Sequence, residues 1–564
     1  MKRSVIRFSL LNTQGNENFI MRSSTWQNRK IKISQMKKLK LYVPVIALLA
    51  LTACKKSFLD TEDITTVSEQ NFYKTPSDAY KAIVGVYDGL QRATTSSTFP
   101  VLLEVMSDNA FGGTGNSDGY GYQMMDEFDK LRSPSDQNLH AEAWTQYYKA
   151  IYRANMLLKN IGQVNWAGGE DLSKRYEAET KFIRAYCYFD MVRFWENIPL
   201  ITEPTIENVP QANPDEVYKL IAEDLKFAVE NLPATNYGSQ SNTTYGRVTK
   251  WSAEALLGKA YLYYTGYYNK TDLAGVVSKA QALGYLEDVI SNGGFGLVDN
   301  FANLWAAASL NDYVGEDNKE TVFAIKYTYT SDWNGNVDGN HWMVMFGIRT
   351  QSIYPYGMGW GGSTVNAKLW NAYNVNDTRR NASIISIDDE NLDFQNKKDQ
   401  REYTGYYWKK YAPMADEAGK SLAEKMGGVN FMISQFQDYV SIRYADVLLM
   451  AAELGSPNAQ TYFDDVRRRA FGANFVQIPV SQANILDERR LEFAGEGIRY
   501  WDLLRQGVNV AASGIAETVT LENGGTDVVK TISASKITET KGLSQIPYSQ
   551  ITLSNGVLKQ NAGW

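Results

Sequence analysis

The most constraining feature of this 564-residue sequence is a stripe of apolar residues between positions 176 and 195. Separated by steps of four, three, four and three residues, its members are Ala178, Phe182, Ala185, Phe189 and Val192. This spacing places all five side chains on one face of an α-helix, whereas a strand would divide them between two faces. The stripe therefore predicts a helix over Tyr176–Trp195 that buries one face against other helices.

Two further segments, Trp144–Ile161 and Trp251–Tyr264, show similar spacing. Small residues such as Gly258 stand near large aromatic ones, as in the helix pairs of tetratricopeptide repeats. Small side chains let paired helices approach closely, and large ones fill the gap between them. Because the repeat is degenerate and interrupted, we expect a mainly α-helical scaffold with insertions, not a regular array.

The segment from about Asp312 to Asn396 differs in composition, because it is rich in Gly, Asn, Tyr and Trp. Long loops of this kind commonly carry function on a rigid support. We therefore expect long irregular loop insertions in this part of the chain.

The amino end carries a secretory signal that begins at Met36. Three lysines at positions 37–40 precede an apolar run of eleven residues, Leu41–Leu51, which is too short to span a bilayer comfortably. The following Leu51-Thr52-Ala53-Cys54 resembles a bacterial lipobox, in which the cysteine thiol receives a diacylglycerol before cleavage. The alternative is an ordinary signal peptide with a chance cysteine.

These features divide the chain into four parts. Residues 1–35 are polar and irregular, and we interpret them as an extension from an over-called start codon. Residues 36–53 are the lipoprotein signal peptide, and residues 54–70 form a tether that acylated Cys54 attaches to membrane lipid. Residues 71–564 are expected to form a single binding domain.

Charge and rare residue types exclude several classes of function. The first 53 residues hold ten Lys and Arg against one acidic residue, which leaves residues 54–564 with a net charge of −15. So acidic a body repels phosphate backbones, and we expect no nucleic-acid partner. The chain has only two cysteines, Cys54 and Cys187, and only two histidines, His140 and His341. Few residues are therefore available for a metal site or a histidine-based catalytic triad, and no cofactor is expected.

Six short blocks of residues occur in a fixed order from the amino end to the carboxyl end. They are Asn71-Phe72-Tyr73 with Ala79-x3-Ile83-x-Gly85-x-Tyr87, Trp144-x3-Tyr148-x2-Ile151-x2-Ala154-Asn155, Glu179-x-Lys181-Phe182-Ile183-Arg184-Ala185-Tyr186-x-Tyr188-Phe189 with Pro199-Leu200, Glu488-Arg489-Arg490-x-Glu492-Phe493 with Glu496-Gly497-x-Arg499-x2-Asp502-Leu503-x-Arg505, Ile546-Pro547, and Gln560-Asn561-x-Gly563. In this order they resemble the SusD/RagB family of outer-membrane nutrient-binding lipoproteins. The resemblance covers essentially the whole mature chain.

The resemblance implies a SusD-like helical fold, anchored on the surface of the outer membrane of a Bacteroidetes-type bacterium. Such proteins cap a SusC-like TonB-dependent transporter and hand it glycans, or peptides in the RagB branch. The implied function is therefore capture of oligosaccharides or polysaccharide and their delivery to that transporter, without catalysis. A peptide-binding importer subunit and a glycoside hydrolase are the alternatives.

The block around Glu492 contains enough carboxylates to suggest catalysis. Glu488, Glu492 and Glu496 lie four residues apart, so a continuous helix would place them on one face. A glycosidase needs one protonated carboxyl group beside an ionised one. The arginines of this block, including Arg489 and Arg499, would instead favour ionisation of every carboxyl group. We therefore interpret the block as a structural ion-pair network.

Two other patterns indicate turns more than ligand sites. Gly357-x-Gly359-x2-Gly362 has dinucleotide-binding spacing, but it follows no hydrophobic strand and precedes no clear helix. Asn334-x-Asn336-x-Asp338-Gly339 offers oxygens that calcium binds, but Met345 stands where an EF-hand requires Glu. Turn chemistry explains these Asn, Asp and Gly residues more simply, and calcium remains the alternative.

Aromatic residues of the Gly/Asn-rich segment are the best candidates for ligand contact. Residues 327–373 hold ten of them in 47 positions. Flat side chains stack on the apolar C–H faces of sugar rings, while Asn, Asp and Arg bind the hydroxyls. The candidates from this segment are Trp333, Trp342, Tyr354, Tyr356 and Trp360. A first long loop is expected to supply a second wall through Asp108, Asn109, Tyr120 and Tyr122.

The lipobox makes a direct prediction. Cys54→Ala is expected to leave the fold intact but to abolish lipid attachment and surface retention, because it removes the acylation point. Metabolic labelling with a radioactive fatty acid measures this, and label that persists in the variant would contradict the lipobox.

Overall fold

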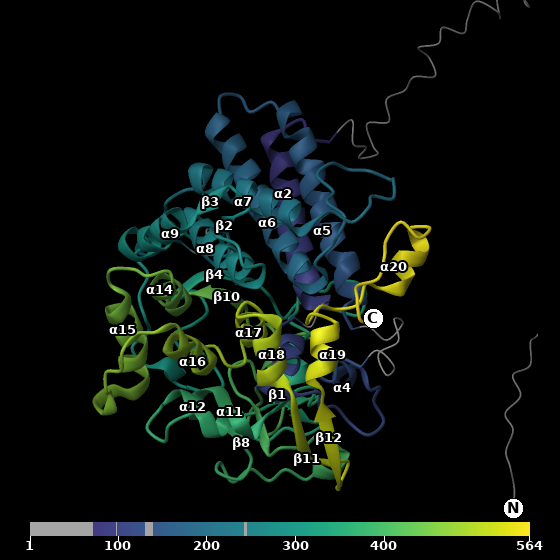
Figure 1. The fold of residues 1–564 in the computed structure, drawn as a ribbon, viewed down its shortest axis with the longest axis vertical. Helices are drawn as coiled ribbons and strands as arrows, with labels where there is room; N and C mark the ends of the chain where they lie inside the picture. The colour runs from purple at the N-terminus through teal and green to yellow at the C-terminus, as the bar shows by residue number, and fades with distance from the viewer. Residues whose placement is uncertain (1–71, 97–98, 130–138, 242–244) are drawn as a thin grey trace, which may run out of the picture. The chain divides into compact units, whose positions relative to one another are not determined.

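The computed structural model describes residues 72–96, 99–129, 139–241 and 245–564 (Figure 1). The signal peptide, Cys54 and the tether lie outside the described residues, so the predictions for them stay predictions.

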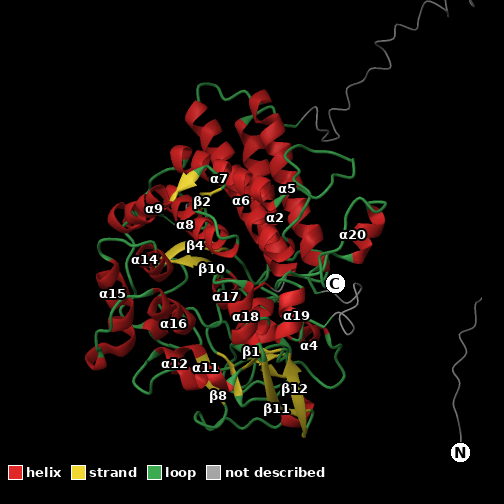
Figure 2. Ribbon diagram, in the orientation of Figure 1, coloured by secondary structure: helices red, strands yellow, loops and turns green. Residues whose placement is uncertain are grey.

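Helices dominate the described chain (Figure 2). They are α2 Pro76–Ser96, α3 Phe99–Val105, α4 Gly121–Asp126, α5 Ala141–Asn160, α6 Glu170–Trp195, α7 Pro214–Asn231, α8 Lys250–Tyr267, α9 Lys279–Asn292, α10 Met343–Phe346, α11 Ala367–Ala372, α12 Arg379–Ser383, α13 Leu422–Lys425, α14 Tyr444–Glu453, α15 Ala459–Phe471, α16 Gln482–Glu492, α17 Arg499–Leu504, α18 Val508–Ile515, α19 Ala534–Glu539 and α20 Tyr548–Leu553.

The strands are short and pair two by two. They are β1 Ala110–Phe111, β2 Asp272–Leu273, β3 Val277–Ser278, β4 Thr321–Ile325, β5 Ile348–Arg349, β6 Met358–Gly359, β7 Thr364–Val365, β8 Ile384–Ser386, β9 Tyr406–Trp408, β10 Tyr439–Arg443, β11 Glu517–Asn523 and β12 Thr526–Ile532. The longest pair, β11–β12, turns through Gly524 and Gly525, whose positive φ angles of 65° and 86° suit a tight hairpin.

The three helices predicted from apolar spacing are confirmed as α5, α6 and α8. Consecutive helices pack side by side from α5 to α9, and α2 packs on α5 and α6. Small residues permit the close approaches: a Cβ added to Gly89 of α2 would lie 2.9 Å from the Ala150 Cα of α5. The mainly α-helical fold with helix pairs and irregular insertions is therefore confirmed.

Helix ends follow local sequence signals. At the start of α7 the Asn213 side chain accepts the Asp215 N–H, and the Glu216 carboxylate accepts the Asn213 N–H at 3.2 Å. This capping box, with Pro214 at the first helical position, satisfies main-chain groups that a helix start leaves unpaired.

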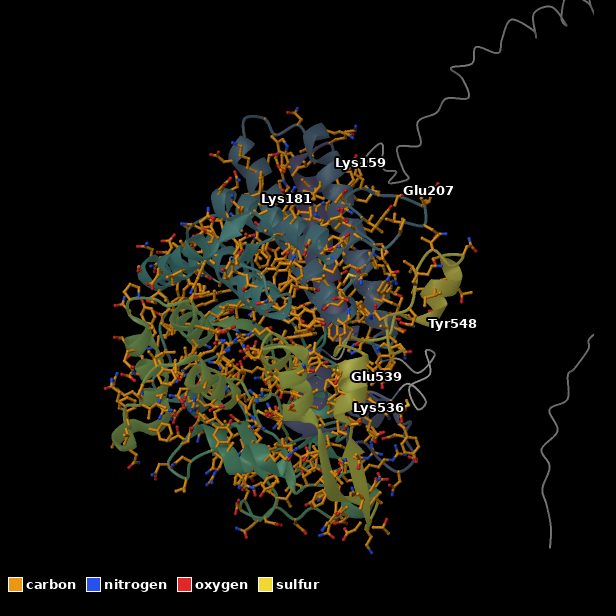
Figure 3. All side chains as sticks on the ribbon, viewed as in Figure 1. Lys159, Lys181, Glu207, Lys536, Glu539 and Tyr548 are labelled. Atoms are coloured by element: carbon orange, nitrogen blue, oxygen red, sulfur yellow. The ribbon has the colours of Figure 1, made fainter. Side chains whose placement is uncertain are left out.

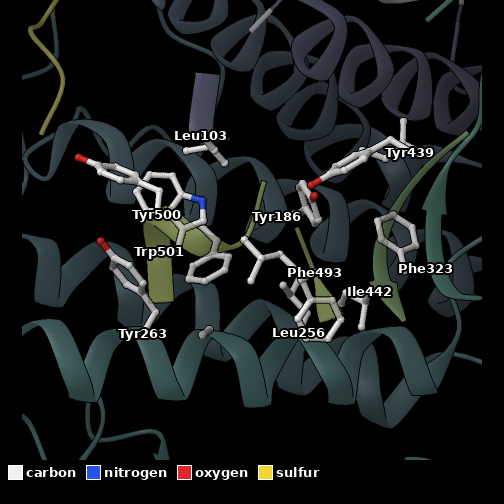
Figure 4. Packing of buried hydrophobic residues seen from close by; sticks show 14 of the residues in the cluster. Leu103, Tyr186, Leu256, Tyr263, Phe323, Tyr439, Ile442, Phe493, Tyr500 and Trp501 are labelled. Carbon is white, nitrogen blue, oxygen red and sulfur yellow. The ribbon is translucent and has the colours of Figure 1, made fainter. Parts of the chain in front are cut away.

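Many of the tyrosines and tryptophans pack in the core (Figure 4). Tyr186, Tyr263, Tyr439 and Trp501 lie there among aliphatic residues such as Leu256, and Trp501 meets Tyr263 edge to face with ring centroids 5.8 Å apart. No described helix is both long and apolar enough to cross a membrane.

A buried ion-pair network joins α12, α15, α16 and β10. Glu492 of α16 accepts from Arg443 at 2.9 Å, from Arg379 at 3.0 Å and from Arg469. Arg443 also binds Glu496 at 2.8 Å. Burial disfavours the charge of Glu492, but the three arginines outweigh it and hold the pKa of Glu492 well below its usual range. These contacts support the interpretation of this block as structural.

Glu492→Gln is expected to lower the free energy of unfolding by about 3–5 kcal/mol, because it leaves buried arginines without their partner charge. Urea denaturation measures the loss. The matched control is Glu223→Gln on the exposed face of α7, where Lys219 lies 3.9 Å away, with an expected change below about 0.5 kcal/mol. Equal effects of the two substitutions would contradict a structural role for the network.

Candidate functional site

The two loops expected to form the site meet in the structure. Strands β1 and β7 pair antiparallel, with Ala110 opposite Val365 and Phe111 opposite Thr364. Beyond β1, the Thr114 N–H donates to the Gly361 carbonyl at 2.5 Å. Pairing across this distance in sequence brings the loop after β1 against the segment between α10 and β7.

A groove of about 490 Å³ opens between these loops. Its lining residues combine ring faces, glycines and polar groups, and are Thr114, Asp118, Gly119, Gly121, Tyr122, Leu139, Met345, Arg349, Thr350 and Trp360. The groove is concave and carries few polar side chains on a largely apolar lining, which is the usual character of a small-ligand site.

Gln400 forms hydrogen bonds to both walls of the groove. Its buried side-chain amide donates to the Thr114 and Gly361 carbonyls, each at 3.1 Å. At the same junction a Cβ on Gly113 would lie 2.1 Å from the Gly361 oxygen, and the φ of Gly113 is +34°. Only glycine fits there, because the two backbones run in direct contact.

Arg349 connects the walls through charge. Its guanidinium donates to the Asp118 carboxylate at 2.8 Å, to Asp399 at 2.9 Å and to the Trp360 carbonyl at 3.3 Å. Asp118 also accepts the Gly115 N–H at 2.8 Å. Arginine suits this position because its planar fork binds several acceptors at once.

Two aromatic residues of the expected set line the groove, and a third, Tyr120, lies beside it. Trp360 and Tyr122 line it, with Trp360 half-buried and Tyr122 almost fully buried. The Trp360 and His341 rings meet edge to face with centroids 5.4 Å apart, and the main-chain N–H of Trp360 donates to the Val344 carbonyl at 2.7 Å. Tyr120 stands at the rim between two lining glycines and is 51% exposed.

Asp108 and Asn109 lie beneath the loop and not at its surface. Arg499 binds the Asp108 carboxylate at 2.8 Å, and Asn109 donates to Glu104 at 3.1 Å. Burial disfavours ionisation of Asp108, but Arg499 and Arg490 outweigh it and lower the pKa of its carboxyl group. In this structure the two residues are buried and hold the base of the loop.

Trp342 and Tyr356 are also core residues. Trp342 is 0% exposed, and its ring meets Tyr411 and Tyr439 edge to face at 5.0 and 5.8 Å. Tyr356 is buried and donates to Glu390 at 2.6 Å. The rings of both residues thus fill the interior in this structure and do not line the groove.

Trp333 and Tyr354 are solvent-exposed, at 66% and 51%, but neither lines the groove. Trp333 lies in a turn in which Asp332 accepts the N–H groups of Asn334 and Asn336 at 2.8 and 3.2 Å. The Asn336 side chain donates to the Thr330 carbonyl at 2.9 Å and accepts the Asp338 N–H at 3.1 Å, as asparagine commonly does in turns. Of the glycine pattern, Gly359 lies on β6, which pairs with β5, and the next element along the chain is the strand β7 and not a helix.

Sequence reasoning missed Asp118, Met345, Arg349 and Thr350 of the groove, and Arg401 behind it. Their side chains become neighbours only through the pairing of β1 with β7. No local pattern distinguishes them from other polar or apolar loop residues.

A second hollow of about 590 Å³ lies between α5, residues 199–209 and α20. Figure 3 labels Glu207, which lines it, and Tyr548 of α20. Neither candidate loop contributes to this hollow, whose walls are α5, α20 and the irregular segment between α6 and α7.

Comparison with known proteins identifies relatives over most of the chain. A family model described as "SusD family" matches residues 396–564, and one described as "Starch-binding associating with outer membrane" matches residues 57–262. SusD-like protein P38 of Formosa agariphila is 26% identical over 507 residues, which are 84% of this chain and 92% of the relative. A SusD-like protein of Bacteroides ovatus is 26% identical over 490 residues, 83% of this chain and 82% of the relative.

Solved structures share the fold. A laminarin-binding SusD-like protein superposes with a TM-score of 0.68 at 28% identity, covering 87% of this chain and all of the other. Surface glycan-binding protein A from Bacteroides thetaiotaomicron, in complex with laminarihexaose, gives a TM-score of 0.71 at 23% identity over 87% of this chain and all of the other. With these relatives, the two matching family models and the helical scaffold described above, the chain belongs to the SusD/RagB family.

Proposed function

We propose that this protein binds oligosaccharides in the groove between the loop after β1 and the segment between α10 and β7. One observation carries the proposal: the groove joins the Trp360 and Tyr122 rings with the polar groups of Asp118, Arg349 and Thr350. Aromatic rings stack on sugar C–H faces, and the polar groups bind hydroxyls.

The relatives support a glycan as the ligand. The structure at 28% identity is named for laminarin binding, and one matching family model is described as starch-binding. The same description, "associating with outer membrane", supports a place at the outer membrane. Within the proposal, acylated Cys54 anchors the protein at the cell surface, and a SusC-like transporter receives the captured glycan.

The charges of the described residues favour capture over hydrolysis. Asp118 is the single carboxylate among the described residues that line the groove, and Arg349 binds it. A glycosidase would need two carboxyl groups there, one of them protonated. The Glu492 cluster does not supply such a catalytic pair, because its carboxylates are buried and paired with arginine. Release of new reducing ends during incubation with the ligand would instead support the hydrolase alternative.

Trp360→Ala is expected to weaken binding by about tenfold or more, roughly 1.4 kcal/mol, since binding energy concentrates in a few aromatic contacts. The measurement is isothermal titration calorimetry of the purified protein with laminarihexaose and maltohexaose, accompanied by thermal melts. The two ligands represent the glucans for which the relatives are named.

Two other tryptophans serve as matched controls. Trp333→Ala should change neither affinity nor stability appreciably, because its ring is exposed outside the groove. Trp342→Ala should cost about 3–5 kcal/mol of stability, because its ring fills the core. Affinity that survives Trp360→Ala but is lost with Trp333→Ala would place the site elsewhere. Binding of peptides in place of glycans would support the RagB-like alternative.

A further inference from the structure

Tyr120 is the one aromatic side chain of the site that stands at the rim and is half exposed. Gly119 and Gly121, its neighbours on both sides, line the groove. Residues 112–119 contain no helix or strand, and Tyr120 directly precedes α4, where its carbonyl accepts the Met124 N–H at 2.9 Å. That bond holds the main chain of Tyr120 and not its ring. A ring on such a loop needs another support to hold one orientation.

Arg401 provides that support from beneath the loop. Its side chain is buried, and its guanidinium carbon lies 4.0 Å from the centroid of the Tyr120 ring. The same guanidinium donates to the main-chain carbonyls of Asn116 and Asp118, each at 2.8 Å, and of Gly119 at 3.1 Å. One side chain therefore fixes both the course of the loop and one face of the ring.

The main chain holds Arg401 itself in place. Its N–H donates to the Thr114 carbonyl at 2.8 Å, next to the bridge between Gly115 and Gln400. The position of the guanidinium is thus set by the same backbone pairing that forms the groove. Because the guanidinium is a planar fork, it can donate several hydrogen bonds to carbonyls while its central carbon stays close to the ring. A lysine ammonium has no such plane.

We propose that Arg401 is a positioning residue that presents Tyr120 as a stacking face for a sugar ring at the rim of the groove. Arg401 lies over the tyrosine ring, and Tyr120 remains 51% exposed. A ring that is ordered before binding loses less conformational freedom when the ligand arrives, which increases affinity. This inference rests on the proposed function, since it assumes that the groove binds a glycan.

The experiment is a double-mutant cycle of Tyr120→Ala and Arg401→Lys, titrated with whichever of laminarihexaose and maltohexaose the wild type binds. Each single variant is expected to weaken binding by about five- to tenfold, and the double variant to bind within about twofold of Tyr120→Ala. Tyr120→Phe, which retains the ring, is expected to stay within about twofold of the wild type. The matched control is Arg380→Lys, whose guanidinium lies 4.5 Å from the Trp370 ring outside the groove and should not affect affinity.

Several results would overturn the inference. If Tyr120→Ala and Arg401→Lys both bind like the wild type while Trp360→Ala loses affinity, the proposed function stands and the role of Arg401 falls. If the fold-losses of affinity of the two single variants multiply in the double variant, Arg401 does not act through Tyr120. If Arg401→Lys unfolds at the titration temperature, Tyr120→Ala alone decides. A Tyr120→Ala variant that binds the glycan as tightly as the wild type overturns the inference. If the wild type binds neither glycan nor any oligosaccharide of a broader array, the proposed function fails together with the inference.

Discussion

Buried arginine–carboxylate pairs fix how the carboxyl-terminal helices meet the rest of the molecule. Around Glu492 they join α12, α15, α16 and β10, and on the next face of α16 Arg489 binds Asp446 at 2.6 Å and Asp502 at 2.8 Å. Burial opposes ionisation of Asp446, but Lys259 and Arg489 outweigh it and lower its pKa to about 2. Such pairs strongly disfavour any arrangement that separates their members, because a lone buried charge is costly.

The same carboxyl-terminal block reaches the site. Arg490 and Arg499 bind Asp108, and the Gly497 N–H donates to Glu104 at 2.8 Å, so residues from opposite ends of the chain hold the base of the loop after β1. Burial raises the pKa of Glu104 to about 7, although the N–H of Gly497 opposes this. A rigid base allows irregular loops above it to keep a defined groove, which is the arrangement expected when function is carried by loops.

Local patterns predicted the scaffold well and the site only in part. Apolar spacing predicted α5, α6 and α8 because these helices bury a face. The arginines near Glu492 indicated a structural ion-pair network, but Glu492 itself pairs with Arg379, Arg443 and Arg469, which lie elsewhere in the sequence. The two loops of the groove were also expected, but Gly/Asn-rich surroundings do not show whether a ring points inward. Trp342 and Trp360 therefore looked equivalent in sequence, although one fills the core and the other lines the groove. Arg349 and Arg401 act through contacts distant in sequence, which no local pattern reports.

The central claim is that an oligosaccharide occupies the groove between the two loops. A crystal structure of the protein with a bound oligosaccharide tests it most directly. The account predicts a sugar ring stacked on Trp360 or Tyr120, with hydroxyls near Asp118 and Arg349. Sugar bound only elsewhere, for instance in the hollow between α5 and α20, would contradict it.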